Sequence, residues 1–285
     1  MRRTFSYAAM TNDERNAADG RFSTVWQPQP LFPGLHMPQY ITQAIILRTT
    51  DFSESDRLVS FYTKDSGRLH GIAKSAKRSL KRFGSSLEPF TLNEITFFAR
   101  EHQDLVRLER CRIVRAFPEI AQNVRRVALG TYLLELVLGL TPEREANPEV
   151  YRLLVYYIDL LTQSSFRESM IRLFELRLFS LLGYEPQFMQ CVSCNTPFYM
   201  DAAYHFSIQR GGIVCPKCEP PLHNMLPLSN GTIRLFQQAR SLSLLKLSRL
   251  FFSRESQDES HKLFARFLEY HMGRQPRSLE VLAQL

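Results

Sequence analysis

The chain has little cysteine, and it lacks several features that mark whole classes of protein. Only five cysteines occur among its 285 residues, too few for the dense disulfide framework of a small secreted domain. No apolar segment of a secretory signal lies between Met1 and the charged stretch 11–15, and no run approaches the roughly eighteen apolar residues of a transmembrane helix. We therefore expect a cytoplasmic protein without a membrane contact.

Catalytic signatures are missing as well. The sequence contains neither a phosphate-binding GxxxxGK[ST] loop nor the HExxH pair of a metalloprotease. Its acidic residues are scattered rather than clustered, and its seven histidines show no metal-ligand spacing. These absences predict a protein that is not an enzyme.

Acidic residues are in the minority. Asp and Glu number 28 against 36 Lys and Arg, which gives a formal net charge of +8 at pH 7. A positive excess attracts polyanions, and its position along the chain indicates where they would bind. A hydrophobic content of 44% is ample for folded cores, and 285 residues are enough for two domains.

The first 36 residues differ in character from the rest of the chain. They are polar or proline-rich and show neither the two-residue period of a strand nor the 3.6-residue period of a helix. We interpret residues 1–36 as a disordered N-terminal extension, with Met37 as an alternative start.

Five short segments rich in β-branched and aromatic residues come next. They lie at residues 40–47, 57–63, 68–73, 92–98 and 105–110. The five-stranded barrel that binds nucleic acid is the OB-fold, so we predict an OB-fold domain over residues 37–115.

The sequence beyond Pro118 has a helical period. Apolar residues recur at helical spacing from 120 to 137, a second helical segment runs from Pro148 to about residue 161, and a third covers 166–182. Helical spacing resumes after Gly231. The predicted fold class is therefore α+β, with the barrel followed by an α-helical domain at 116–285 that a metal-binding insertion interrupts at 188–222.

Four cysteines stand as two close pairs with twenty residues between them. Each pair can sit on a tight turn that directs both sulfurs at one centre, and this spacing is typical of a structural Cys₄ zinc site. Two disulfides or a redox dithiol are the alternatives, which the low cysteine count and the missing export signal disfavour. We predict one structural Zn²⁺ bound by Cys191, Cys194, Cys215 and Cys218. Cys111 is predicted to be a half-buried structural thiol.

The excess positive charge is local. Residues 64–82 hold seven cations against the single acid Asp65, a net +6 of the chain's +8. The seven are Lys64, Arg68, Lys74, Lys77, Arg78, Lys81 and Arg82. A cluster of one sign can release counterions from a phosphate backbone, whereas a loop that serves only solubility would carry mixed charge. The nearby rings of Phe61, Tyr62, Phe83 and Phe90 are either platforms for single-stranded bases or part of the barrel core.

Taken together, these features resemble the bacterial DNA repair protein RecO family. In both, a basic OB-like domain leads into a helical domain that a CxxC…CxxC segment interrupts. Four stretches carry the likeness across roughly residues 37–285: Asp56–Val59 leading to Thr63 and Gly67; Ala73–Arg78 with Leu87–Phe90; Phe206–Ser207 through Gly211–Cys215; and His271–Arg274 with Ser278 and Leu282.

The resemblance implies a recombination mediator of the RecF pathway, located in the cytoplasm with the nucleoid. Proteins of that family bind single- and double-stranded DNA, anneal complementary strands and contact the acidic C-terminal tail of single-stranded-DNA-binding protein (SSB). With RecR they help to load RecA onto SSB-coated DNA. The resemblance implies DNA contact for Arg57, Lys74, Lys77 and Arg78, and we add their neighbours Arg68, Lys81 and Arg82. Candidates for the SSB contact are Arg125, Arg126, Arg152, Arg172 and Arg177.

Two other functions remain open at this point. A zinc-ribbon transcription or RNA-binding factor would share the metal site and the basic loop, but strict sequence preference in duplex DNA would distinguish it. A metallo-hydrolase is the weaker alternative. Unfolding on chelation, without any turnover, would remove it.

Overall fold

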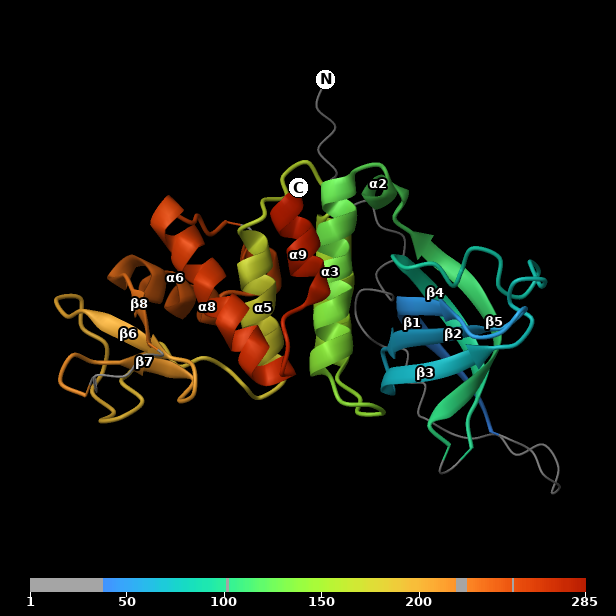
Figure 1. The fold of residues 1–285 in the computed structure, drawn as a ribbon, viewed down its shortest axis with the longest axis horizontal. Coiled ribbons are helices and arrows are strands. Elements are labelled where there is room, and N and C mark those ends of the chain that lie inside the picture. Colours follow the sequence, from blue (N-terminus) through green and yellow to red (C-terminus); the bar gives the residue numbers. More distant parts are fainter. Residues whose placement is uncertain (1–37, 101–102, 219–224, 248) are drawn as a thin grey trace, which may run out of the picture.

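The computed structural model describes residues 38–100, 103–218, 225–247 and 249–285. The predicted extension at 1–36, the alternative start at Met37 and the end of the predicted metal module at 219–222 lie outside these residues. A barrel forms one end of the molecule, a layer of helices the middle, and a small sheet the other end (Figure 1). The predicted α+β class, an OB-like barrel followed by helices with a cysteine module, is confirmed.

Five strands close into the barrel in the order β1-β2-β3-β5-β4. They are β1 (Gln39–Asp51), β2 (Arg57–Thr63), β3 (Gly67–Ala73), β4 (Thr91–Phe98) and β5 (Leu105–Ala116). All neighbouring pairs are antiparallel except β3 with β5. Buried and half-buried residues alternate along β3 and β4, because successive side chains point to opposite faces of a strand.

Strand β1 is buried on both faces and therefore joins the two halves of the protein. Ala44 and Ile46 belong to the core inside the barrel, while Ile45 and Leu47 belong to the core that includes the helices. This explains the unbroken apolar run in β1, which is typical of a strand covered on both sides.

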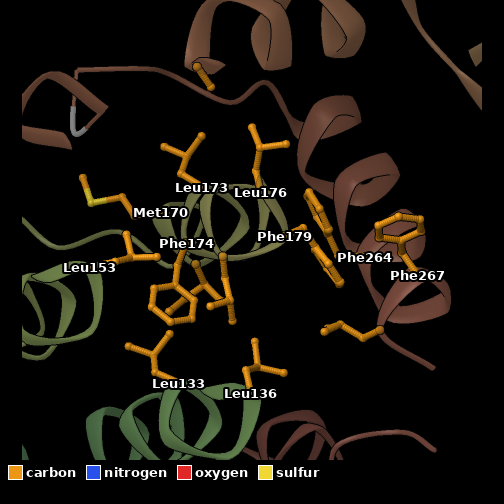
Figure 2. Close-up of a cluster of buried hydrophobic side chains, with 14 of the residues drawn as sticks. Leu133, Leu136, Leu153, Met170, Leu173, Phe174, Leu176, Phe179, Phe264 and Phe267 are labelled. Atoms are coloured by element: carbon orange, nitrogen blue, oxygen red, sulfur yellow. The ribbon is translucent and has the colours of Figure 1, made fainter. Parts of the chain in front are cut away.

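The helical part is built on two central helices, α3 and α5. Their bounds are α2 (Pro118–Ala121), α3 (Val124–Leu140), α4 (Pro148–Leu160), α5 (Met170–Leu181), α6 (Asn230–Ser241), α7 (Leu244–Leu247), α8 (Arg254–Met272) and α9 (Arg277–Gln284). Figure 2 shows Phe174 of α5 directed towards Leu133 of α3, and Phe179 of α5 beside Phe264 and Phe267 of α8. None of the helices in this part of the chain is both long and apolar enough to cross a membrane.

Side chains of the preceding residues cap several helices. At the starts of α3 and α4, the side chains of Asn123 and Asn147 each accept a hydrogen bond from the backbone N–H three residues later. Ser229 and Ser253 do the same for α6 and α8. These caps satisfy amide groups that the first helical turn leaves without a partner.

A small sheet was not predicted. It consists of β6 (Tyr204–Ser207), β7 (Gly212–Val214) and β8 (Met225–Leu228), in the order β7-β6-β8. The strands have only three or four residues each, which is too short to show a two-residue period in sequence.

The barrel and the helical layer meet through the β2–β3 turn. Gly67 has φ +66°, and a Cβ atom there would lie 1.9 Å from the carbonyl oxygen of Glu145. The backbone N–H of Arg144 donates to the carbonyl of Arg68 at 2.9 Å. Only glycine permits so close an approach at a left-handed position, so Gly67 fixes how the barrel sits on the helical layer.

Candidate nucleic-acid interface and metal centre

Five of the seven clustered cations lie in the loop between β3 and β4, residues 74–90, which we call the basic loop, whereas Lys64 lies in the β2–β3 turn and Arg68 in β3. The β1–β2 turn and the C-terminal end of β5 lie at the same end of the barrel, because β2 and β3 pair Arg57 with Ala73 and β4 and β5 pair Thr91 with Ala116. The backbone N–H of Cys111 in β5 donates to the carbonyl of Arg82 at 3.0 Å. This hydrogen bond attaches the middle of the loop to the barrel.

Apolar side chains anchor the basic loop. Ala76, Phe83 and Leu87 are buried in the core inside the barrel. Phe90 contacts α3 at Gly130, where a Cβ atom would lie 2.6 Å from the phenyl ring. These contacts hold the inner face of the loop against the protein, so the charged side chains lie on its outer face.

A carboxylate also shapes the loop. Asp56 of the β1–β2 turn accepts the backbone N–H of Ser75 at 2.8 Å. This hydrogen bond, together with the hydroxyls of Ser55 and Ser53 and the charge of Lys74, outweighs partial burial and lowers the pKa of Asp56. Its charged form stabilises the loop conformation.

The predicted DNA-binding cations fall into two groups. Lys77 Nζ lies 2.9 Å from a carboxylate oxygen of Asp51, and Arg57 Nη1 lies 3.0 Å from Glu88 Oε1. Arg82 donates to the carbonyl of Lys74 and the hydroxyl of Ser79, and its guanidinium stacks on Phe83. By contrast, three cations, Lys74, Arg78 and Lys81, are exposed and make no direct ion pair in the described part of the chain, although the charge of Lys74 acts on Asp56.

Arg68 occupies a different place. Its side chain is only 16% exposed, and its Nε donates to the carbonyl of Thr141 at 2.9 Å. Its Nη1 lies 3.3 Å from Glu143 and 2.8 Å from His70 Nε2. These partners place Arg68 at the junction between barrel and helices, away from the basic loop, and its contact with DNA remains a prediction.

The four aromatic rings for which the sequence allowed either base stacking or a place in the core belong to the interior. Phe61, Tyr62 and Phe83 are at most 3% exposed, and Phe90 packs on α3. Sequence reasoning instead missed Phe52, which is 60% exposed in the β1–β2 turn. The signal available was an aromatic residue inside the otherwise polar turn Asp51-Phe52-Ser53-Glu54-Ser55.

Arg110 of β5 was missed as well. It is exposed, it makes no ion pair within the described residues, and it precedes Cys111, which is bonded to the basic loop. Cys111 itself was predicted to be half-buried but is buried in the barrel core, and burial raises its pKa to about 12. Arg110 therefore adds a further exposed cation beside the basic loop.

The five helical arginines named for the SSB contact all have partners inside the protein. Arg125, Arg152 and Arg172 pair with Glu168, Glu149 and Glu175, respectively. Arg126 donates to the carbonyl of Thr162, and Arg177 to the carbonyls of Ala239 and Leu242. Their contact with SSB remains a prediction, and the structure singles out none of them.

The four paired cysteines converge. Their sulfur atoms all lie within 4.8 Å of one another, and Cys194 Sγ is 3.7 Å from Cys215 Sγ. A tetrahedral zinc ion with Zn–S bonds of about 2.3 Å would need sulfurs about 3.8 Å apart. Cys191 and Cys215 are buried, whereas Cys194 is exposed, so the cluster spans the boundary between the core and the surface.

Backbone N–H groups favour the thiolate form of Cys191, which is the form that binds a metal ion. Burial opposes ionisation of Cys191, but the N–H groups of Cys215, Cys194 and Ser193 outweigh it and lower its pKa to about 6. The hydrogen bond to Cys194 and burial instead raise the pKa of Cys218 to about 12. Four thiolates cannot ionise together at such short range unless a cation offsets their repulsion, so this donor set fits a metal ion.

The protein so described is a two-part molecule, with an OB-like barrel that carries a basic loop and a helical part that holds a four-cysteine candidate metal site. Residues 37–117 match the family described as "Recombination protein O N terminal", and residues 121–280 match "Recombination protein O C terminal". The chain belongs to the RecO family of DNA repair proteins, as its sequence indicated.

Relatives support this membership over most of the chain. The DNA repair protein RecO of Syntrophus aciditrophicus (strain SB) is 34% identical over 246 residues, which are 86% of this chain and 95% of the relative. That of Syntrophobacter fumaroxidans is 35% identical over 85% of this chain and 96% of the relative. That of Geobacter sulfurreducens is 34% identical over 85% and 97%. The match covers both the barrel and the helical part, whereas a zinc ribbon shared with an unrelated protein would match only the cysteine segment.

Proposed function

We propose that this protein is a recombination mediator of the RecF pathway. It binds single- and double-stranded DNA, anneals complementary strands and, with RecR, helps to load RecA onto SSB-coated DNA. Family membership across the whole described chain supports the role in repair. The observation that carries DNA binding is the anchored basic loop, whose unpaired cations lie on its outer face.

The loop geometry suits contact with phosphates. Lys74, Arg78 and Lys81 are exposed and can replace the counterions of a DNA backbone, which releases those counterions to solution. Phosphate contacts carry no sequence information, so binding is expected to tolerate any sequence. A mediator that acts at gaps of every sequence requires this tolerance.

Annealing requires no catalytic group. Two strands meet more readily when a protein neutralises their phosphates, and no covalent bond is made or broken. We therefore propose a non-enzymatic role, carried out in the cytoplasm at the nucleoid. The SSB tail, an acidic and apolar peptide, would bind the helical part, although none of the arginines there stands out as its receptor.

We further propose that the four cysteines bind one structural Zn²⁺. The residues that would hold it are Cys191, Cys194, Cys215 and Cys218, and their sulfur spacing supports this assignment. Four protein ligands leave no open coordination position, so the ion would stabilise the fold and supply no reaction chemistry.

The most direct test is annealing of complementary oligonucleotides by the full chain, with and without SSB. The expected result is faster annealing than in buffer, retained when SSB coats both strands. SSB without its acidic C-terminal tail is the matched control and should abolish annealing of coated strands only. A chain that neither binds nor anneals oligonucleotides in dilute buffer would refute the proposal.

A further inference from the structure

An aromatic ring is exposed at the same end of the barrel as the basic loop. Phe52 is 60% exposed, whereas Phe61, Phe83 and Phe97 of the barrel are at most 3% exposed. A phenyl ring left in water forgoes the hydrophobic free energy of burial, and the barrel core next to it shows that phenylalanine can be buried here. Single exposed apolar side chains are common, and Phe251 is 76% exposed, so the position of Phe52 beside the basic loop is what distinguishes it.

The turn that carries this ring is held by hydrogen bonds. The N–H of Phe52 donates to the carbonyl of Asp56 at 3.1 Å, and the N–H of Asp56 donates to the hydroxyl of Ser53 at 3.1 Å. On the side of the basic loop, Lys77 Nζ donates to the carbonyl of Ser53 at 3.2 Å and the Lys77 N–H to the carbonyl of Ser55 at 3.1 Å. The turn and the loop thus form one connected surface.

This surface combines an apolar ring with positive charge. The residue that follows Phe52 bonds directly to Lys77, and the outer face of the loop carries Arg78, Lys81 and the 80% exposed Leu80. An unpaired nucleotide offers the complementary pair of groups, a flat π face and a phosphate. Duplex DNA offers the phosphates, but its base faces are stacked on one another.

We propose that Phe52 is a stacking platform for an unpaired nucleobase, whose flanking phosphates are bound by the unpaired cations of the basic loop. The inference rests on the proposed DNA binding and adds the class of ligand that this end of the barrel prefers, namely unstacked bases of a single strand. Every base has a π face, so the platform gives preference for single strands without preference for sequence.

The test compares three ligands of equal length: oligo(dT), an oligonucleotide of abasic spacers, and a blunt duplex. Affinities of the full chain and of Phe52→Ala are measured by fluorescence anisotropy at low salt. Phe52→Ala is expected to weaken oligo(dT) binding between about 5-fold and 150-fold and to leave the abasic and duplex ligands unchanged. Phe52→Trp is expected to retain oligo(dT) affinity.

Matched controls separate the ring from its apolar surface and from exposure in general. Phe52→Leu keeps an apolar side chain without a π face and is expected to behave like Phe52→Ala. Phe251→Ala removes a ring that is 76% exposed in the helical part and is expected to change nothing. In a Trp26→Phe background, Phe52→Trp provides the only indole, whose fluorescence oligo(dT) should quench and the abasic ligand should not.

The experiment distinguishes failure of the stacking platform from failure of the proposed DNA binding. If the unmodified chain binds no oligonucleotide, the proposed function itself fails. If it binds oligo(dT) but Phe52→Ala binds equally well, the stacking platform is refuted while DNA binding stands. An equal loss of affinity for all three ligands would also refute the stacking platform, because Phe52 would then act only through the shape of the turn.

Discussion

Replacing Lys74, Arg78 and Lys81 together by alanine tests whether the unpaired cations of the basic loop contact phosphates. All three side chains are exposed and make no direct ion pair within the described residues, and the charge of Lys74 acts on Asp56 only at a distance, so their removal should change the melting temperature little. The matched control is the double variant Arg57→Ala/Glu88→Ala, which removes the ion pairs of Arg57 with Glu88 and with Asp51 and leaves the net charge of the protein as it was.

The magnitude follows from counterion release. Each phosphate neutralised in a single strand contributes about −0.7 to the slope of log K against log salt, so three contacts contribute about −2. Between 50 mM and 200 mM salt, this contribution weakens binding by about 18-fold. The triple-alanine variant should lose that part of the salt dependence, whereas the ion-pair variant should keep it.

The assay is fluorescence anisotropy of a labelled single strand, titrated with the full chain at several salt concentrations. A triple-alanine variant with the slope of the unmodified protein would refute the assignment of the loop as the phosphate-binding surface. The control variant carries its own information. A slope smaller by about 0.7 in Arg57→Ala/Glu88→Ala would show that Arg57 exchanges Glu88 for a phosphate when DNA binds.

Three further changes test the fold and the metal centre. Cys215→Ser, or removal of metal by a chelator, should cost several kcal/mol and lower the Tm by roughly 5–10 °C, and an unchanged melting curve would exclude a structural metal. Burial raises the pKa of Glu175 to about 7 against an ordinary value of 4.5, so its contribution to stability is fully present below pH 4.5 and is lost as the pH rises through about 7. Glu175→Gln should remove this loss in the free energy of unfolding, measured by urea unfolding between pH 4.5 and about 7. A free energy of unfolding that falls with pH as steeply as in the unmodified protein would contradict this expectation. Gly67→Ala should destabilise by more than Gly84→Ala, although both glycines have positive φ and share a cost of about 1–2 kcal/mol. The new Cβ would lie 1.9 Å from the carbonyl oxygen of Glu145 at Gly67, but 3.2 Å from the carbonyl oxygen of Leu80 at Gly84. Equal urea midpoints for the two glycine variants would show that the approach to Glu145 is unimportant.

Local sequence signals predicted the barrel strands and the main helices well. The strand over 57–63 was predicted with its observed bounds, because its apolar residues lie beside a clear turn at Lys64–Gly67. Prolines at 118 and 148 lie at the first positions of α2 and α4, where a missing N–H costs nothing. Strand β5 continues beyond the prediction to Ala116, since its exposed residues pair with β4 by backbone hydrogen bonds, which composition does not reveal.

Charge pairing across the fold could not be read from the sequence. The cluster of cations at residues 64–82 has one acid within it, yet the fold brings Asp51 to Lys77 and Glu88 to Arg57, pairs that lie far apart in the chain. Side-chain proximity of this kind depends on the barrel register and on the path of the loop. The sequence therefore indicated where the charge is concentrated, but not which cations are left unpaired.

The cysteines show the opposite case, because their spacing alone predicted their convergence. Two residues between the members of each pair set the geometry locally, and only the twenty-residue connection needed to bring the pairs together. The domain boundaries at 37–115 and 116–285 and the contacts with RecR and SSB remain predictions, since they concern cooperative folding units and surfaces that a single chain does not identify.

The distribution of buried residues determines how far the loss of a metal would spread. Cys191 and Cys215 belong to the large core that contains the helices, together with Phe188 and Phe206, whereas the interior of the barrel forms a separate core. Loosening the sulfur cluster therefore exposes helical core first, while the basic loop stays anchored to the barrel by Phe83 and its neighbours. It follows that a metal-free protein should lose stability in its helical part before it loses affinity for single strands, so that the proposed contact of the helical part with SSB would fail while DNA binding persists.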